Sequence, residues 1–153
     1  MPPEMSRVAT RRRSLAALVV SASLFLAGCL TPQQQTVLDE MNVDRQANGR
    51  VALGAHDVAV AKAQAWADKI ARDGGLSHSN LADGLGGLCW RGIGENGGYG
   101  GSIASVEDGY MNSPGHRANI LNTAWDVVGV GHAPGTVSGR SVVFTVQVFV
   151  DLC

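Results

Sequence analysis

The sequence lacks the local motifs of several common enzyme classes. It has no Gly-x-Ser-x-Gly nucleophile elbow, and its glycines are not placed between a strand and a helix as a phosphate or dinucleotide site requires. Basic side chains are also few, with twelve Lys and Arg against thirteen Asp and Glu. This balance excludes the strongly basic surface that is typical of a nucleic-acid-binding protein.

Long apolar runs are scarce, and the run near the start has the length of a signal sequence. Leu15–Ala27 comprises 13 mainly apolar residues, whereas a membrane-spanning helix needs about 20. Arg7 and the Arg11–Arg13 cluster precede the run, as basic residues precede the apolar part of a signal peptide. A short buried helix is the alternative, and these arginines argue against it.

The run ends in Leu26-Ala27-Gly28-Cys29, which resembles the lipobox of bacterial lipoproteins. The resemblance implies cleavage before Cys29 and attachment of lipid to its sulfur. We therefore predict a signal peptide over residues 1–28, a lipidated tether over residues 29–36, and an extracytoplasmic protein anchored to the cell membrane through Cys29. The three consecutive arginines resemble a twin-arginine signal too weakly to decide the export route.

Without residues 1–28, eight basic and twelve acidic side chains remain on 125 residues, a net charge of −4 with neutral histidines. This charge predicts no nucleic-acid partner. The length suits one domain, over residues 37–153, with a single core. The sequence has no internal repeat, and we expect a monomer.

Cysteine is scarce as well, with three residues in the chain. If Cys29 carries lipid, Cys89 and Cys153 remain, and outside the cytoplasm two such thiols are expected to pair. The alternative is two separately buried thiols. A disulfide across this separation of 64 residues would stabilise the fold by roughly 4 kcal/mol.

Hydrophobic periodicity separates a helical first part from a strand-forming end. The expected helices cover residues 31–48, 57–73 and 102–112, and the expected strands cover residues 126–132 and 140–150. Val143 and Phe149 make the last strand apolar on both faces, which predicts a central strand with helices on both sides. The expected fold class is α+β, with helices layered on an antiparallel hairpin.

Residues 75–101 are rich in glycine, a composition that is often disordered. The same segment contains a cysteine, a tryptophan and a carboxylate. We therefore predict an ordered loop that the disulfide holds in place, with at most a short strand near Cys89–Ile93.

The stretch Met111–Asn122 combines several residue types with separate physical roles. Ser113 can cap the free N–H groups of a helix start, and Pro114 suits the first helical position, where no N–H is needed. His116 follows within the first turn, so a rigid element sets its imidazole. For a lone histidine, a capped core helix would be the better interpretation.

His78 and Glu95 join His116 as candidates for chemistry, because each lies beside turn residues or a helix start. Two imidazoles and one carboxylate suit a divalent metal, with zinc the first choice. They also suit a general acid–base pair whose imidazole is oriented by the carboxylate. The three residues lie 17 and 21 positions apart, so spacing alone establishes neither arrangement.

Several short motifs occur in an order that is typical of one family. They are Asn42-x-x-Arg45, Ala65-Trp66-Ala67, Ser77-His78-Ser79, Gly94-Glu95-Asn96, the run from Asn112 to Leu121, and Val128-Gly129-Val130-Gly131. From about Val37 to Val150 the chain thereby resembles the CAP superfamily of cysteine-rich secretory proteins, venom antigens and pathogenesis-related proteins, in its short bacterial, SCP-like branch. The resemblance implies a three-layer α–β–α sandwich with a small antiparallel sheet. It also implies a surface cleft where two histidines and two acids meet and can hold a metal ion.

Carried over to this chain, the resemblance assigns the histidines to His78 and His116 and the first acid to Glu95. The second acid has no counterpart, because Tyr110–Ser113 contains no carboxylate where larger members have one. Glu107 lies one turn earlier, where we expect a solvated helix face together with Asp108; the alternative is that Glu107 turns into the cleft. Three ligands and a water remain an allowed zinc geometry, with weaker affinity than a four-ligand structural site.

Three further side chains are assigned structural roles. Asn96 is expected to hold its loop through hydrogen bonds to the backbone. His56 and His132 are expected to be ordinary surface histidines.

Two functions are consistent with these residues. The preferred hypothesis is a binding or scaffold module whose cleft holds an envelope ligand, a peptide, a glycan or a lipid, with or without a divalent metal. The alternative is a metal-assisted hydrolase of the peptidase kind that uses His78, Glu95 and His116. The missing second acid and the lack of a separate nucleophile motif favour binding.

Cys29→Ser tests the predicted anchor. Because a lipobox requires the thiol, the variant is expected to leave the membrane fraction or to accumulate unprocessed, as measured by fractionation and mass spectrometry. A variant that stays with the membranes after an alkaline wash, at the mass of the wild type, would show that lipid on Cys29 is not the anchor.

Overall fold

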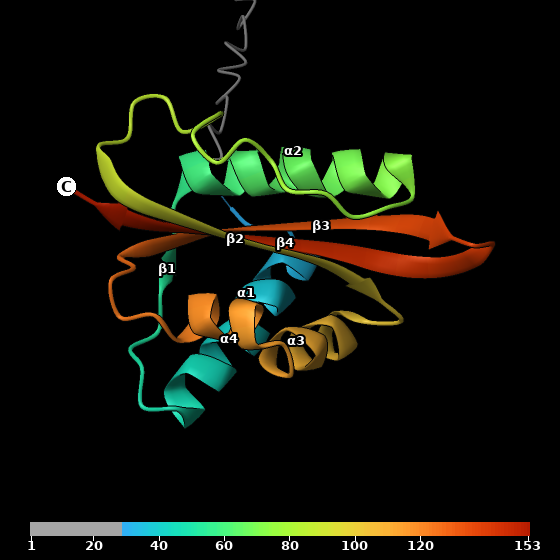
Figure 1. Ribbon diagram of the computed structural model, residues 1–153, viewed down its shortest axis with the longest axis horizontal. Coiled ribbons are helices and arrows are strands. Elements are labelled where there is room, and N and C mark those ends of the chain that lie inside the picture. Colours follow the sequence, from blue (N-terminus) through green and yellow to red (C-terminus); the bar gives the residue numbers. More distant parts are fainter. Residues whose placement is uncertain (1–28) are drawn as a thin grey trace, which may run out of the picture.

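Two long strands rich in β-branched residues form the centre of the sheet in the computed structural model, which describes residues 29–153. β3 (Val127–Val137) and β4 (Arg140–Leu152) form an antiparallel hairpin. β2 (Trp90–Gly100) pairs antiparallel with β4, and the short β1 (Gly54–Ala55) pairs parallel with β3. The strand order is therefore β1-β3-β4-β2 (Figure 1). The signal peptide predicted over residues 1–28 lies outside the described residues.

Four helices within residues 29–153 cover this sheet on both faces. α2 (Asp57–Asp73) packs on one face, and α1 (Pro32–Ala47), α3 (Ile103–Met111) and α4 (Pro114–Leu121) lie on the other (Figure 1). This arrangement confirms the predicted three-layer α–β–α sandwich. Within residues 29–153, no helix is both long enough and apolar enough to cross a membrane.

The alternation along β4 divides the core into two clusters, as the sequence predicted for a central strand. Phe144, Val146, Val148 and Val150 point toward α2 and its alanines. Phe149 points the other way, into a cluster with residues of α1, α3 and α4. Because both faces of the strand are covered, β4 supplies side chains to each of the two layers.

α2 lies unusually close to the sheet because two glycines of β3 face it. A Cβ on Gly129 would lie 2.0 Å from the carbonyl of Ala59, and one on Gly131 would lie 2.3 Å from that of Ala63. Backbone cannot yield at such distances, so these positions require glycine. Trp66 lies three residues after Ala63 and is only partly buried, whereas Ala67 is fully buried.

β2 is longer than the short strand expected near Cys89–Ile93. Its glycines make room for aromatic rings: a Cβ on Gly94 would lie 2.9 Å from Trp125, and one on Gly98 would lie 2.8 Å from Tyr110. Glycine has low strand propensity, so the pattern suggested a loop. The strand forms because β4 pairs with it along its length, and the rings explain why glycines occupy these positions.

The predicted disulfide between Cys89 and Cys153 is confirmed, with a Cα–Cα distance of 5.3 Å. The N–H of Cys153 also donates to the carbonyl of Cys89 at 3.1 Å. Together these bonds join the start of β2 to the end of β4, which fixes one end of the sheet.

Candidate functional site

Glu95 connects the glycine-rich segment to the sheet. Its carboxylate is almost fully buried on β2, and Oε1 lies 2.9 Å from Nδ1 of His78. The Ser79 N–H donates to the same oxygen at 2.9 Å, and the Ser79 hydroxyl donates to Oε2. Both carboxylate oxygens are therefore occupied, and they hold the loop that carries His78.

His78 itself faces solvent, with 68% of its side chain exposed. Its Nδ1 is oriented by Glu95, which leaves Nε2 for an external partner. Beside it lies an open cavity of about 430 Å³, lined by His78, Ser79, Leu81, Ile93, Gly94, Glu95 and Asn119. We call this cavity the His78 cleft.

His116 lies on α4 and is not among the residues that line the His78 cleft. Its Nδ1 lies 3.0 Å from the Ser113 hydroxyl, and its ring centroid lies 5.1 Å from that of Tyr110. The predicted role of Ser113 as a side-chain cap is wrong, because the hydroxyl makes no cap hydrogen bond and orients His116 instead. Burial, and then the nearby His78, lower the pKa of His116, so its imidazole stays neutral to lower pH than usual.

The side chains around the His78 cleft present no ready three-ligand metal site. Glu95 directs both oxygens at His78 and Ser79, and over residues 29–153 no three His, Cys, Asp or Glu side chains are grouped to hold a metal ion. The free donors are Nε2 of His78 and Nε2 of His116, because each Nδ1 is hydrogen-bonded. Zinc binding therefore stays a prediction, and it rests on two imidazoles.

A chain of hydrogen-bonded side chains runs from Asn119, which lines the cleft, into the core. The Asn119 amide donates to Asn96 at 2.9 Å, the Asn96 amide donates to Gln147 at 3.0 Å, and the Gln147 amide donates to Oε2 of Glu107 at 2.6 Å. Asn96 also donates to the backbone carbonyl of His116 at 3.2 Å, and Asn119 donates to that of Glu95 at 3.3 Å. Asn96 thus bonds to the backbone as expected, but it lies in β2 and its partner belongs to α4, so it does not hold a loop of its own. We call these four side chains the amide chain.

The expectation that Glu107 lies on a solvated helix face is wrong, although Asp108 beside it is exposed. Glu107 is 4% exposed, and its Oε1 has no hydrogen-bond partner. Burial raises the pKa of Glu107 to about 8, with smaller contributions from nearby acids, against the lowering effect of Gln147. Glu107 is therefore mainly a neutral acid at neutral pH, at the end of the amide chain and not in the cleft.

Lys62 is a site residue that the sequence did not reveal. It lies on the buried face of α2, and its ammonium donates to the Ser79 hydroxyl at 3.0 Å, to the Asn80 carbonyl at 2.9 Å and to the Asp83 carbonyl at 2.7 Å. Burial lowers its pKa. The available signal was a lysine at helical spacing from Ala59 on an apolar face, which needs buried partners.

His56 and His132, which were expected to be ordinary surface histidines, are both partly buried. His56 caps α2, because its Nδ1 accepts the N–H of Val58 at 3.3 Å. His132 lies within β3, partly buried, and this burial lowers its pKa. Neither residue lines the His78 cleft.

The protein is therefore of the class of α–β–α sandwiches that carry a cleft beside one strand of the sheet, here β2. The model of CAP, the cysteine-rich secretory protein family, matches residues 38–149, and the chain belongs to this family. Members of the family are typically extracellular or secreted. No curated protein sequence matches the chain.

Several solved structures share the fold at low sequence identity. An outer surface protein of Borrelia burgdorferi matches with a TM-score of 0.65 and 16% identity, over 79% of this chain and 93% of its own. A cysteine-rich secretory protein of Staphylococcus aureus matches at 0.61 and 18%, over 78% and 38%. Venom allergen-like protein 4 of Schistosoma mansoni matches at 0.58 and 13%, over 80% and 91%. At these identities the likeness shows the fold alone.

Glu107→Gln tests the neutral state of the buried acid. The raised pKa means that the native state holds a proton which the unfolded chain releases above pH 4.5. The contribution of Glu107 to the free energy of unfolding is therefore fully present below pH 4.5. It is lost as pH rises from 4.5 to about 8, by up to about 1.4 kcal/mol per pH unit. Urea unfolding at pH 5 and pH 9 is expected to show a smaller loss for Glu107→Gln than for the wild type.

Asp108→Asn is the matched control, since it removes an exposed acid from the same helix. This control is expected to follow the wild type across the pH range. Equal pH dependence in wild type and Glu107→Gln would show that Glu107 is ionised throughout.

Proposed function

We propose that the chain is an extracytoplasmic binding module, held at the membrane through lipid on Cys29, whose His78 cleft receives an envelope ligand. The observation that carries this proposal is the occupancy of Glu95. Its two oxygens already accept bonds from His78 and Ser79, so Glu95 fixes a recognition surface and is not free to take a proton from a substrate.

The alternative, a metal-assisted hydrolase, needs a held ion and a free base at the same place. With Glu95 engaged, the two imidazoles supply the ion's ligands and no carboxylate of the cleft remains as base. Glu107 cannot serve, because it lies in the core with Gln147. The geometry therefore favours recognition over turnover.

Among peptide, glycan and lipid, an extended peptide fits the cleft best. β2 is an edge strand, paired with β4 on one side only, and its residues Ile93–Glu95 line the cleft. Edge strands offer unpaired backbone groups to an added strand. The exposed Nε2 of neutral His78 can then accept a hydrogen bond from an N–H of the peptide, because Nδ1–H donates to Glu95.

The zinc prediction is checked by calorimetric titration. Two imidazole ligands are expected to bind zinc weakly near neutral pH and to release it below about pH 6, because only neutral imidazoles coordinate metal. His116→Ala is expected to abolish the binding, whereas His56→Ala, which lies outside the cleft, is expected to change nothing. Chelation should not unfold the protein, since the two core clusters are apolar.

Equal zinc binding by the wild type and both variants would place the ion elsewhere. Absence of zinc binding in all three proteins would remove the metal from the proposal. Recognition of a ligand by the cleft is tested separately by NMR.

NMR titration with three probes tests the ligand class: tetra-alanine, an N-acetylglucosamine tetramer and phosphatidylglycerol vesicles. Tetra-alanine is expected to shift the amide signals of Ile93–Asn96 and the imidazole signals of His78. His78→Ala is expected to weaken this binding by about tenfold, the loss of one good hydrogen bond. His56→Ala serves as the matched control and should bind as the wild type does.

Shifts caused only by the sugar or only by the vesicles would reassign the ligand to that class. No shift from any probe would contradict the binding proposal. Cleavage of tetra-alanine that His116→Ala stops would establish the hydrolase instead.

A further inference from the structure

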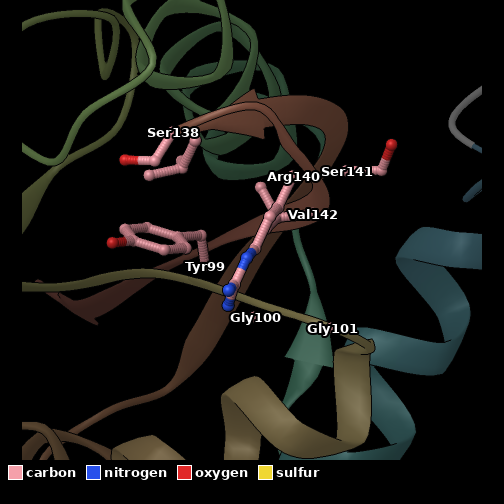
Figure 2. A pocket seen from close by; sticks show the side chains of 8 residues that line it. Tyr99, Gly100, Gly101, Ser138, Arg140, Ser141 and Val142 are labelled. Atoms are coloured by element: carbon pink, nitrogen blue, oxygen red, sulfur yellow. The ribbon is translucent and has the colours of Figure 1, made fainter.

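A second cavity lies at the far end of β2, beside the tip of the β3–β4 hairpin (Figure 2). Its volume is about 560 Å³, and it is lined by Tyr99, Gly100, Gly101, Val137, Ser138, Arg140, Ser141 and Val142. None of these residues lines the His78 cleft. We call this cavity the hairpin pocket.

Tyr99 gives the hairpin pocket an aromatic wall. One side of its ring lies against the buried Phe144, with 5.3 Å between the ring centroids, so the ring is held in place. The residue is nevertheless 42% exposed, among the largest exposures of an aromatic side chain in residues 29–153. A fixed and exposed ring is a platform for a flat partner.

Arg140 supplies a cation to the same cavity. Figure 2 shows its side chain extending toward Gly100. Arg91 pairs with Asp151 at the other end of the sheet, whereas Arg140 takes part in none of the ion pairs formed within residues 29–153. A guanidinium with free donors recognises a carboxylate through two parallel hydrogen bonds.

Ser138 is held in an unfavourable backbone conformation at the pocket. Its φ is +49°, and it is the one non-glycine residue with positive φ among those described. The following Gly139 has φ +78°, so the two residues form a hairpin turn in which Asn-Gly would be the favoured pair. Serine in this conformation has an energetic cost. Binding of a ligand by the Ser138 hydroxyl, which lies at the pocket, would offset this cost.

We infer that the hairpin pocket binds a carboxylate-bearing sugar ring. The C–H face of the ring packs on Tyr99 by dispersion, the carboxylate pairs with Arg140, and the sugar hydroxyls exchange hydrogen bonds with Ser138. Serine and tyrosine hydroxyls both donate and accept, as the ring hydroxyls of a sugar also do.

Other ligand classes fit this lining less well. An acyl chain needs an enclosed apolar cavity, whereas here the apolar side chains besides Tyr99 are the two valines Val137 and Val142. A peptide with a free C-terminal carboxylate would use Arg140, but it would not need the Ser138 hydroxyl beside an aromatic face. The acidic sugar uses all three side chains at once.

NMR titration of the full-length protein with glucuronate tests the inference, with glucose as the probe that keeps the ring and lacks the carboxylate. Glucuronate is expected to shift the amide signals of 99–101 and 138–142, and glucose is expected to bind at least about tenfold more weakly. Arg140→Ala and Tyr99→Leu are each expected to weaken glucuronate binding by about tenfold or more. Tyr99→Phe, which keeps the ring, should retain most of it.

Ser138→Asn separates a binding role from a structural one. The Asn-Gly pair suits the turn, so resistance to urea is expected to rise while glucuronate binding falls. Arg91→Ala is the matched control for charge, and it should bind glucuronate as the wild type does.

Four outcomes would overturn the inference. These are equal binding of glucose and glucuronate, an unchanged affinity in Arg140→Ala, no shift with glucuronate at tens of millimolar, or shifts in 99–101 caused by the dipeptide Ala-Val and not by glucuronate. The last would make the hairpin pocket a site for peptide carboxylates. Because the signals followed are those of 99–101 and 138–142, the result does not depend on whether the His78 cleft binds its own ligand.

Discussion

The amide chain behind the His78 cleft is the interaction on which the site depends. It runs from Asn119 on α4 through Asn96 on β2 and Gln147 on β4 to Glu107 on α3, with each donor directed toward Glu107. Such a chain fixes the orientation of every amide in it, because reversing one would place two donors or two acceptors against each other. A neutral Glu107 at its end avoids the cost of a buried charge. These hydrogen bonds thereby fix the layer of α3 and α4 to the sheet at β2, the strand that carries Glu95.

The two histidines are positioned from opposite layers of the sandwich. His116 is set from the α4 side, through Asn96 at its carbonyl and Ser113 at its ring. His78 is set from the α2 side, where Glu95 orients its ring and Lys62 holds the residues that follow it. The two imidazoles are close enough for one to lower the pKa of the other. Each histidine is thus oriented by a side chain of its own, His78 by Glu95 of β2 and His116 by Ser113 at the start of α4.

Features that depend on neighbouring residues in the chain were predictable from the sequence. The alternation in β4, the helix start at Ser102 and the pairing of Cys89 with Cys153 follow from local period, capping and cysteine number. Features that depend on what the fold places opposite a residue were not. Gly98 belongs to a strand because β4 pairs with it, and it is glycine because Tyr110 needs its space. Glu107 is buried because Gln147 of a distant strand donates to it. The candidate pair His78 and Glu95 was found because turn residues flank both, whereas no local pattern identified Lys62.

The alternation of β2 explains why both cavities lie along one strand. Asn96 and Gly98 face the layer of α3 and α4, where they meet the amide chain and Tyr110. The odd-numbered residues face the other way, so Glu95 meets His78 and Tyr99 meets Phe144 on the side of α2. Four residues of extended chain separate Glu95 from Tyr99 by about 13 Å, and between them a Cβ on Gly97 would meet nothing within 4 Å. Gly97 thus leaves open space on the same face of β2, between the residue that borders the His78 cleft and the one that borders the hairpin pocket.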